Sequence, residues 1–160
     1  IFLLLTRPEG YLLALVLFFI AGATDYFDGY LARKYNLTSE IGEILDPIAD
    51  KILIVFVLFG LSVNLTSYFI AFMASLIITR EIWVGALRDF NARKGRSDVT
   101  KVTFLAKIKT SIQLFTISIY LLGLTLNNML ILLFSDMFLF LSLLITIYTG
   151  YIYTYNSLKN

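Results

Sequence analysis

The sequence predicts an all-α protein that crosses a membrane several times. Three observations predict this class: 59% of the residues are hydrophobic, charged residues make up only 15% of the chain, and the mean hydropathy is +0.83. Such a chain is too apolar for a soluble domain. With two prolines in 160 residues and no linker rich in Pro or Gly, we expect a single transmembrane domain, 1–160.

The predicted helices follow from the apolar runs, because a bilayer core needs roughly 20 apolar residues per helix. Such runs lie at 11–30, 46–63, 66–87, 102–123 and 137–156. Before them, the apolar residues 1–5 and the segment 6–10 are typical of the last turns of an earlier helix and a tight loop. We therefore expect a bundle of six transmembrane helices, with the first helix largely missing from this sequence.

Most basic residues gather in alternate connections. One group is Arg33 and Lys34, a second lies within 88–109, and Lys159 is near the end, whereas the connections at 64–67 and 125–128 contain no Lys or Arg. Loops rich in Lys and Arg stay on the cytoplasmic side. The sequence therefore predicts both termini, and the site described next, on the cytoplasmic face.

Four aspartates lie at the inner ends of the first two apolar runs, namely Asp25, Asp28, Asp46 and Asp50. Their i, i+3 and i, i+4 spacings place each pair on one face of a helix. Four carboxylates at neutral pH repel one another unless cations lie between them, and Mg²⁺ or Mn²⁺ prefer such oxygen ligands. Because the chain has no Cys and no His, proton transfer is left to carboxylates, Lys or Tyr.

Simpler roles are possible for single members of this set. Asp46 followed by Pro47 is typical of a helix N-terminus, where Asp caps the helix. Head groups also solvate charges near a membrane, and Asp50 could pair with Lys51 or Arg33. Neither alternative explains four aspartates together, since ionisable residues within membrane segments are functional by default.

The residues between the aspartates suit a phosphate-bearing ligand. Gly29 and Gly42 allow close approach of a ligand or helix to the backbone, and Ala32 keeps the next turn slim. Arg33 has the forked guanidinium that binds diphosphate oxygens.

The stretch from Asp25 to Asp50, D-x2-D-G-x2-A-R-x8-G-x3-D-x3-D, resembles the signature of the CDP-alcohol phosphatidyltransferase family at every fixed position. The resemblance implies a membrane enzyme, usually a homodimer, that attacks a CDP-activated lipid with a hydroxyl group and releases CMP. It implies two metal ions, one on Asp25, Asp28 and Asp46 and one on Asp25, Asp46 and Asp50, with Asp50 also the general base. It also implies contacts to the CDP-lipid from Asp25, Gly29, Ala32, Arg33, Ser39 and Gly42.

The acceptor site is predicted from basic residues on helix ends: Arg80, Arg88, Lys107 and Lys109. Arg80 lies inside an apolar run, where an unused charge is costly; an internal salt bridge to Glu81 or an aspartate is the alternative role. A cationic pocket suits a phosphorylated acceptor. Segments 79–88 and 106–110 resemble the bacterial branch of the family that uses CDP-diacylglycerol and sn-glycerol 3-phosphate, which implies a bacterial inner membrane and phospholipid biosynthesis.

Other functions predict different patterns. Inositol phosphate is a second candidate acceptor for the same cationic pocket. A divalent-cation transporter would place acidic residues near the midplane of the membrane, whereas here they lie at one face. A polyprenyl transferase would carry D-D-x-x-D clusters, which the sequence lacks. We expect membrane lipids and a second copy of the chain as partners, and no nucleic acid.

Overall fold

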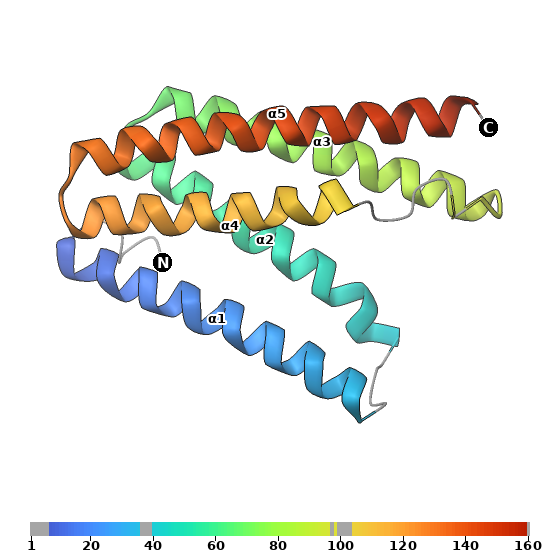
Figure 1. Cartoon of the computed structure of the whole chain (residues 1–160), viewed down its shortest axis with the longest axis horizontal. Helices are drawn as coiled ribbons and strands as arrows, with labels where there is room; N and C mark the ends of the chain where they lie inside the picture. The colour runs from blue at the N-terminus through green and yellow to red at the C-terminus, as the bar shows by residue number, and fades with distance from the viewer. Residues whose placement is uncertain (1–6, 36–39, 97, 99–103, 160) are drawn as a thin grey trace.

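The computed structural model describes residues 7–35, 40–96, 98 and 104–159. Within these ranges the chain forms five helices (Figure 1). They are α1 (Pro8–Lys34), α2 (Glu40–Asn64), α3 (Tyr68–Arg93), α4 (Phe104–Thr125) and α5 (Met129–Lys159). The prediction of an all-α protein is confirmed.

Two short turns close one end of the bundle. Thr66 and Asn127 each have φ of 48°, the left-handed conformation that ends a helix. Directly afterwards, the Ser67 hydroxyl accepts a hydrogen bond from the Ile70 N–H and caps α3. Asn128 caps α5 in the same way, because its side-chain oxygen accepts from the Leu130 N–H at 3.0 Å. These caps fix where α3 and α5 begin.

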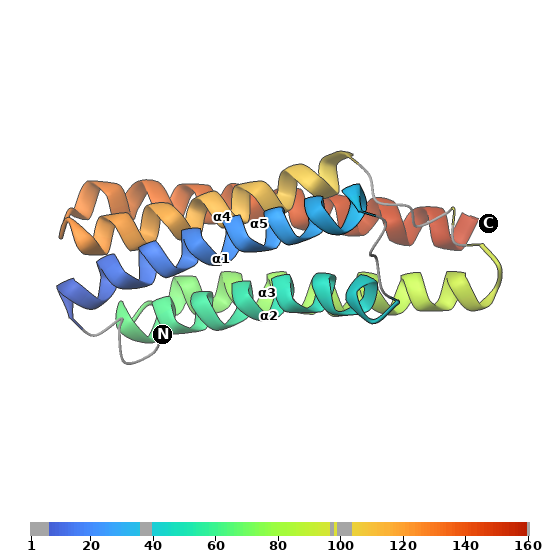
Figure 2. The same ribbon diagram turned by 90° about the horizontal axis from the view of Figure 1, so that it is seen from below.

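The helices pack in two layers (Figure 2). α4 lies between α1 and α5, while α3 packs against both α5 and α2. α1 and α2 follow each other in the chain, yet their described backbones stay apart, and the Tyr11 hydroxyl of α1 donates to Asn64 Oδ1 of α2 at 3.1 Å. α1 contacts α4 and diverges from it toward the α1–α2 connection (Figure 1). This divergence leaves space between α1, α2 and α4.

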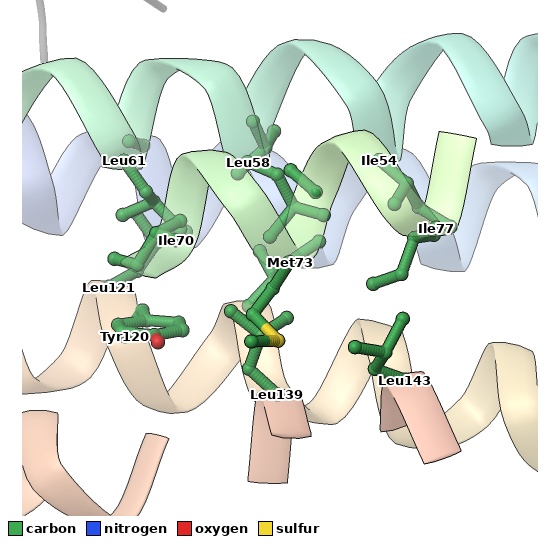
Figure 3. Packing of buried hydrophobic residues seen from close by; sticks show 14 residues of the cluster. Ile54, Leu58, Leu61, Ile70, Met73, Ile77, Tyr120, Leu121, Leu139 and Leu143 are labelled. Atoms are coloured by element: carbon green, nitrogen blue, oxygen red, sulfur yellow. The ribbon is translucent and has the colours of Figure 1, made fainter. Parts of the chain in front are cut away.

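The core is built mainly from α2, α3, α4 and α5, and α1 adds Ala14 (Figure 3). Leu58 and Leu61 of α2 meet Ile70 of α3, Tyr120 of α4 and Leu139 of α5, and each is at most 1% exposed. In a bilayer, lipid tails are as apolar as these side chains, so close packing rather than transfer from water favours the bundle. The core therefore holds together the three helices that carry Lys51, Arg80 and Lys109.

The surface is as apolar as the core. Large apolar side chains are more than half exposed, among them Phe19, Phe72, Phe134 and Met137. In a membrane, lipid tails would cover them. Among the described residues, four helices contain a stretch long and apolar enough to cross a membrane, and α2 contributes the shorter stretch Lys51–Asn64. The protein is a multi-pass membrane protein.

Two predicted boundaries were wrong. The last span was placed at 137–156, but α5 begins at Met129, because Asp136 does not interrupt it: its carboxylate accepts a hydrogen bond from the Tyr120 hydroxyl at 2.5 Å. The second span was placed at 46–63, but α2 begins at Glu40. Pro47 therefore lies inside a helix, which neighbouring helices make tolerable in membranes.

Candidate active site

Charged residues gather at the end of the bundle where α1 and α3 end and where α2 and α4 begin (Figures 1 and 2). We call this the charged end. The predicted grouping of the basic connections on one side is confirmed by this arrangement, since Lys34, Arg88 and Lys159 all lie on the terminal parts of helices that finish there. The opposite end holds the two capped turns.

The first aspartate pair lies near the end of α1. Asp25 and Asp28 are both exposed, and Gly29 after them is partly exposed. Neither carboxylate forms an ion pair with another described residue. Among the described residues nothing neutralises these two carboxylates.

The second pair belongs to the first half of α2. Asp46 and Asp50 lie inside this helix, so the alternative role of Asp46 as a helix cap is excluded: the helix begins at Glu40. For six predicted site residues the structure describes the helical backbone alone, and Ser39 lies outside the described residues; the six are Ala32, Arg33, Gly42, Asp46, Asp50 and Lys107.

A metal centre built only from described residues is not present, because no group of three or more acidic, Cys or His side chains comes together among them. Asp25 and Asp28 nevertheless fit a divalent ion by their chemistry: they are two exposed carboxylates, one helical turn apart, without a basic partner among the described residues. Hard oxygen donors of this kind suit Mg²⁺ or Mn²⁺.

A cavity of 640 Å³ lies between α2, α3 and α4. Its apolar wall is interrupted by seven charged or polar side chains: Lys51, Arg80, Glu81, Arg88, Lys109, Thr110 and Gln113. The structure therefore brings Arg80, Arg88 and Lys109 to one cavity, as predicted. We call it the basic cavity.

Arg80 is buried, with 9% of its surface exposed, and three of its nitrogens donate hydrogen bonds. Nε donates to the Thr146 carbonyl at 2.8 Å, Nη2 to the Thr149 hydroxyl at 2.6 Å and Nη1 to Glu81 at 2.7 Å. The predicted alternative, a salt bridge to Glu81, is thus present. A guanidinium has five N–H donors, so two have no partner among the described residues.

Glu81 and Lys51 are site residues that the sequence reasoning missed. Glu81 Oε1 also accepts from the buried Lys109 Nζ, and Glu81 Oε2 lies 3.9 Å from Lys51 Nζ. Their positions in the sequence could have indicated a role in the site, since Lys51 directly follows Asp50 and Glu81 directly follows Arg80. The contact from Glu81 to Lys109 spans two helices and has no local signal.

Arg88 has an unused donor. Its Nε is buried and has no hydrogen-bond partner among the described residues, while its guanidinium carbon lies 5.4 Å from the centre of the Tyr153 ring. A buried donor without a partner is costly. A ligand with oxygen acceptors in the basic cavity would remove this cost.

A second and larger hollow of 1290 Å³ lies between α1, α2 and α4, where α1 diverges. Its lining is almost entirely apolar, with Phe18 and Phe115 among its walls, and Asp25 is its one charged lining residue among those described. We call it the apolar groove. Ile52 and Phe56 of α2 line both the groove and the basic cavity.

Fold and site together define a multi-pass helical membrane protein in which one helix separates an apolar groove from a basic cavity. The chain belongs to the CDP-alcohol phosphatidyltransferase family, which residues 1–148 match.

Relatives with curated names agree with this family. The chain is 41% identical over 150 residues to a protein of Rickettsia bellii, covering 93% of this chain and 81% of the relative. It is 41% identical over 133 residues to one of Cereibacter sphaeroides and 34% identical over 105 residues to one of Escherichia coli K12, and spans 58% of the length of each. All three are named CDP-diacylglycerol–glycerol-3-phosphate 3-phosphatidyltransferase.

Proposed function

We propose that the protein is a phosphatidylglycerophosphate synthase, which transfers the phosphatidyl group of CDP-diacylglycerol to sn-glycerol 3-phosphate and releases CMP. The names of the relatives support this activity, and so does the basic cavity, because a neutral acceptor needs no cluster of cations. The product serves the synthesis of phosphatidylglycerol and cardiolipin.

The observation that carries the proposal is the position of α2 between the two cavities. Ala49 lines the apolar groove and Lys51 lines the basic cavity. Asp50, the proposed general base, lies between Ala49 and Lys51 in the chain, in the same helical turn. A reaction that joins an apolar donor to a phosphorylated acceptor needs its base at such a boundary.

The apolar groove suits the acyl chains of the donor lipid, since it opens among membrane helices and is walled by apolar side chains. Asp25 lines the groove, which supports a position for the diphosphate beside the aspartate motif. The residues proposed to bind the CDP-lipid are those of the signature: Asp25, Gly29, Ala32, Arg33, Ser39 and Gly42.

Asp25, Asp28, Asp46 and Asp50 are proposed to hold Mg²⁺ or Mn²⁺, two ions in all. Such ions, when bound, neutralise the diphosphate and the charge that develops on the attacked phosphorus. The chain's own carboxylates fix where the diphosphate lies, and Arg33 is positioned in sequence to add a forked contact.

Arg80, Arg88 and Lys109 of the basic cavity are proposed to bind the phosphate of the acceptor. Lys107 has the same proposed role, which rests on the sequence alone. Asp50 removes the proton from the acceptor hydroxyl. The hydroxyl oxygen then forms a bond to the lipid-bearing phosphorus of the diphosphate, the bond from that phosphorus to the bridging oxygen breaks, and CMP leaves with that oxygen.

Location and assembly follow from the same pattern. We propose a single domain in a bacterial inner membrane, with the charged end facing the cytoplasm, where soluble sn-glycerol 3-phosphate is present. The positive-inside rule supports this orientation. A homodimer is proposed from the family resemblance.

The decisive test is CMP release from CDP-diacylglycerol by the purified protein in detergent, in the presence of Mg²⁺ or Mn²⁺. Glycerol 3-phosphate, inositol phosphate and serine are compared as acceptors, with Asp50→Asn as the inactive control. We expect CMP release with glycerol 3-phosphate alone, and its loss in Asp50→Asn. Release of CMP with inositol phosphate instead would support the proposed reaction and contradict the proposed acceptor.

A further inference from the structure

Glu81 is the one acidic side chain among the described residues that line the basic cavity. Cations from three helices reach its carboxylate: Lys51 of α2, Arg80 of α3 and Lys109 of α4. Glu81 itself is largely buried, with 18% of its side chain exposed. A single carboxylate thus connects the three helices that form the cavity.

The three cations differ in what else holds them. Arg80 also donates to the Thr146 carbonyl and the Thr149 hydroxyl of α5, so α5 fixes its place without Glu81. Lys109 has 7% of its side chain exposed, and its ion pair among the described residues is with Glu81. A lysine ammonium sits on a flexible four-carbon stem, so the position of Lys109 depends on Glu81.

Charge leads to the same conclusion. Lys51, Arg80 and Lys109 repel one another across an apolar wall, where charges interact more strongly than in water. One carboxylate reduces this repulsion but leaves a net positive charge, which a phosphate can neutralise. Arg88 adds a fourth cation on the same cavity.

Resting on the proposed function, we propose that Glu81 is a positioning residue for the acceptor: it holds the ammonium of Lys109 in the basic cavity and thereby sets the affinity for the phosphate of glycerol 3-phosphate. Glu81 acts through Lys109 and does not touch the reacting atoms. Its effect is therefore on binding of the acceptor, not on binding of the lipid donor.

The test replaces Glu81 with Gln, which keeps the shape and removes the charge. We expect the KM for glycerol 3-phosphate to rise by about tenfold or more, as is typical when a residue that orients a binding group is lost, with the KM for CDP-diacylglycerol unchanged. Asp89→Asn is the matched control, since Asp89 lies on the same helix in an exposed pair with Arg93. That variant retains both KM values.

A double-mutant cycle with Lys109→Met separates positioning from general damage. If Glu81 acts through Lys109, adding Glu81→Gln to Lys109→Met raises the KM for glycerol 3-phosphate no further. Additive effects would overturn the proposal, and so would an unchanged or lowered KM in Glu81→Gln, because a lowered value would mean that Glu81 competes with the phosphate.

Thermal unfolding of each variant tests whether it is folded. If Glu81→Gln is not recovered folded, Glu81→Asp tests the proposal in its place. Aspartate keeps the charge, but its shorter side chain does not reach Lys109 as well. The same rise in the KM for glycerol 3-phosphate is expected. Failure of the two ideas is distinguishable: if the wild-type protein releases no CMP with glycerol 3-phosphate, the proposed function is wrong, whereas an active wild type with an unaffected Glu81 variant overturns only the role of Glu81.

Discussion

The two cavities on either side of α2 are built by opposite means. The basic cavity has its cations fixed by specific partners, with Arg80 bonded to Thr146 and Thr149 and Lys109 bonded to Glu81. The described residues that line the apolar groove form no such network; the groove exists because α1 packs on α4 and diverges from α2. A rigid polar site suits a small ligand recognised by charge, and an open apolar site suits a flexible lipid.

The difference predicts that small changes damage the basic cavity more than the groove. In the basic cavity a shift of less than 1 Å breaks hydrogen bonds that have defined geometry. In the groove, apolar walls tolerate changes of shape as long as the volume remains. Three substitutions test this contrast, from the largest effect to the smallest.

Gly150→Ala should have the largest effect, although the residue is on α5 and outside both cavities. A Cβ at Gly150 would lie 3.0 Å from Arg80 Cγ and 3.2 Å from Arg80 Nε, so Arg80 must move away from its partner, the Thr146 carbonyl. We expect the KM for glycerol 3-phosphate to rise by about tenfold, since small misplacements of binding groups cost this much or more. Steady-state kinetics with varied acceptor measure it.

Leu144→Ala is the control for Gly150→Ala, because Leu144 lies on the same helix and is about half exposed. It should leave the KM for glycerol 3-phosphate unchanged. Equal KM values for Gly150→Ala and the wild type would show that Arg80 can move without loss, and the contrast between the cavities would then be wrong.

Ser118→Phe should have a smaller effect, on the donor alone. Ser118 lines the apolar groove from α4, and a phenyl ring there removes part of its volume. We expect the KM for CDP-diacylglycerol to rise by about threefold to tenfold, the range of about 1 kcal/mol in binding, with the KM for glycerol 3-phosphate unchanged. Activity in mixed micelles with varied CDP-diacylglycerol measures it.

Ser75→Phe is the matched control for that variant. Ser75 is exposed on α3, and like Ser118 its hydroxyl donates to a carbonyl of the preceding turn, but it lines neither cavity. A threefold to tenfold rise in this variant too would point to a general effect of an added ring on the membrane helices.

The sequence predicted the helices and part of the site for identifiable reasons. Apolar runs of bilayer length mark helices, and Arg80 stood out because a charge inside such a run is costly. The start of α5 was missed because Asp136 looked like the end of a span, and only the fold brings the Tyr120 hydroxyl to it. Glu81 was seen as a partner of Arg80 alone, because its contacts with Lys51 and Lys109 depend on how α2 and α4 pack.

Tyr120→Phe should leave the KM for glycerol 3-phosphate and the KM for CDP-diacylglycerol unchanged. It is therefore the substitution with the smallest expected effect on activity. Tyr120 is fully buried on α4, and its hydroxyl donates to Asp136 of α5 near the capped end, away from both cavities. Removing the hydroxyl leaves the carboxylate without this donor, which costs about 1–3 kcal/mol of stability. Thermal unfolding in detergent should show a lower Tm than for the wild type, whereas Tyr148→Phe, at an exposed position of α5, should not. A changed KM for glycerol 3-phosphate in Tyr120→Phe would mean that the α4–α5 packing transmits strain to Lys109 and Thr146, so that the basic cavity depends on the whole hairpin and not on its own contacts.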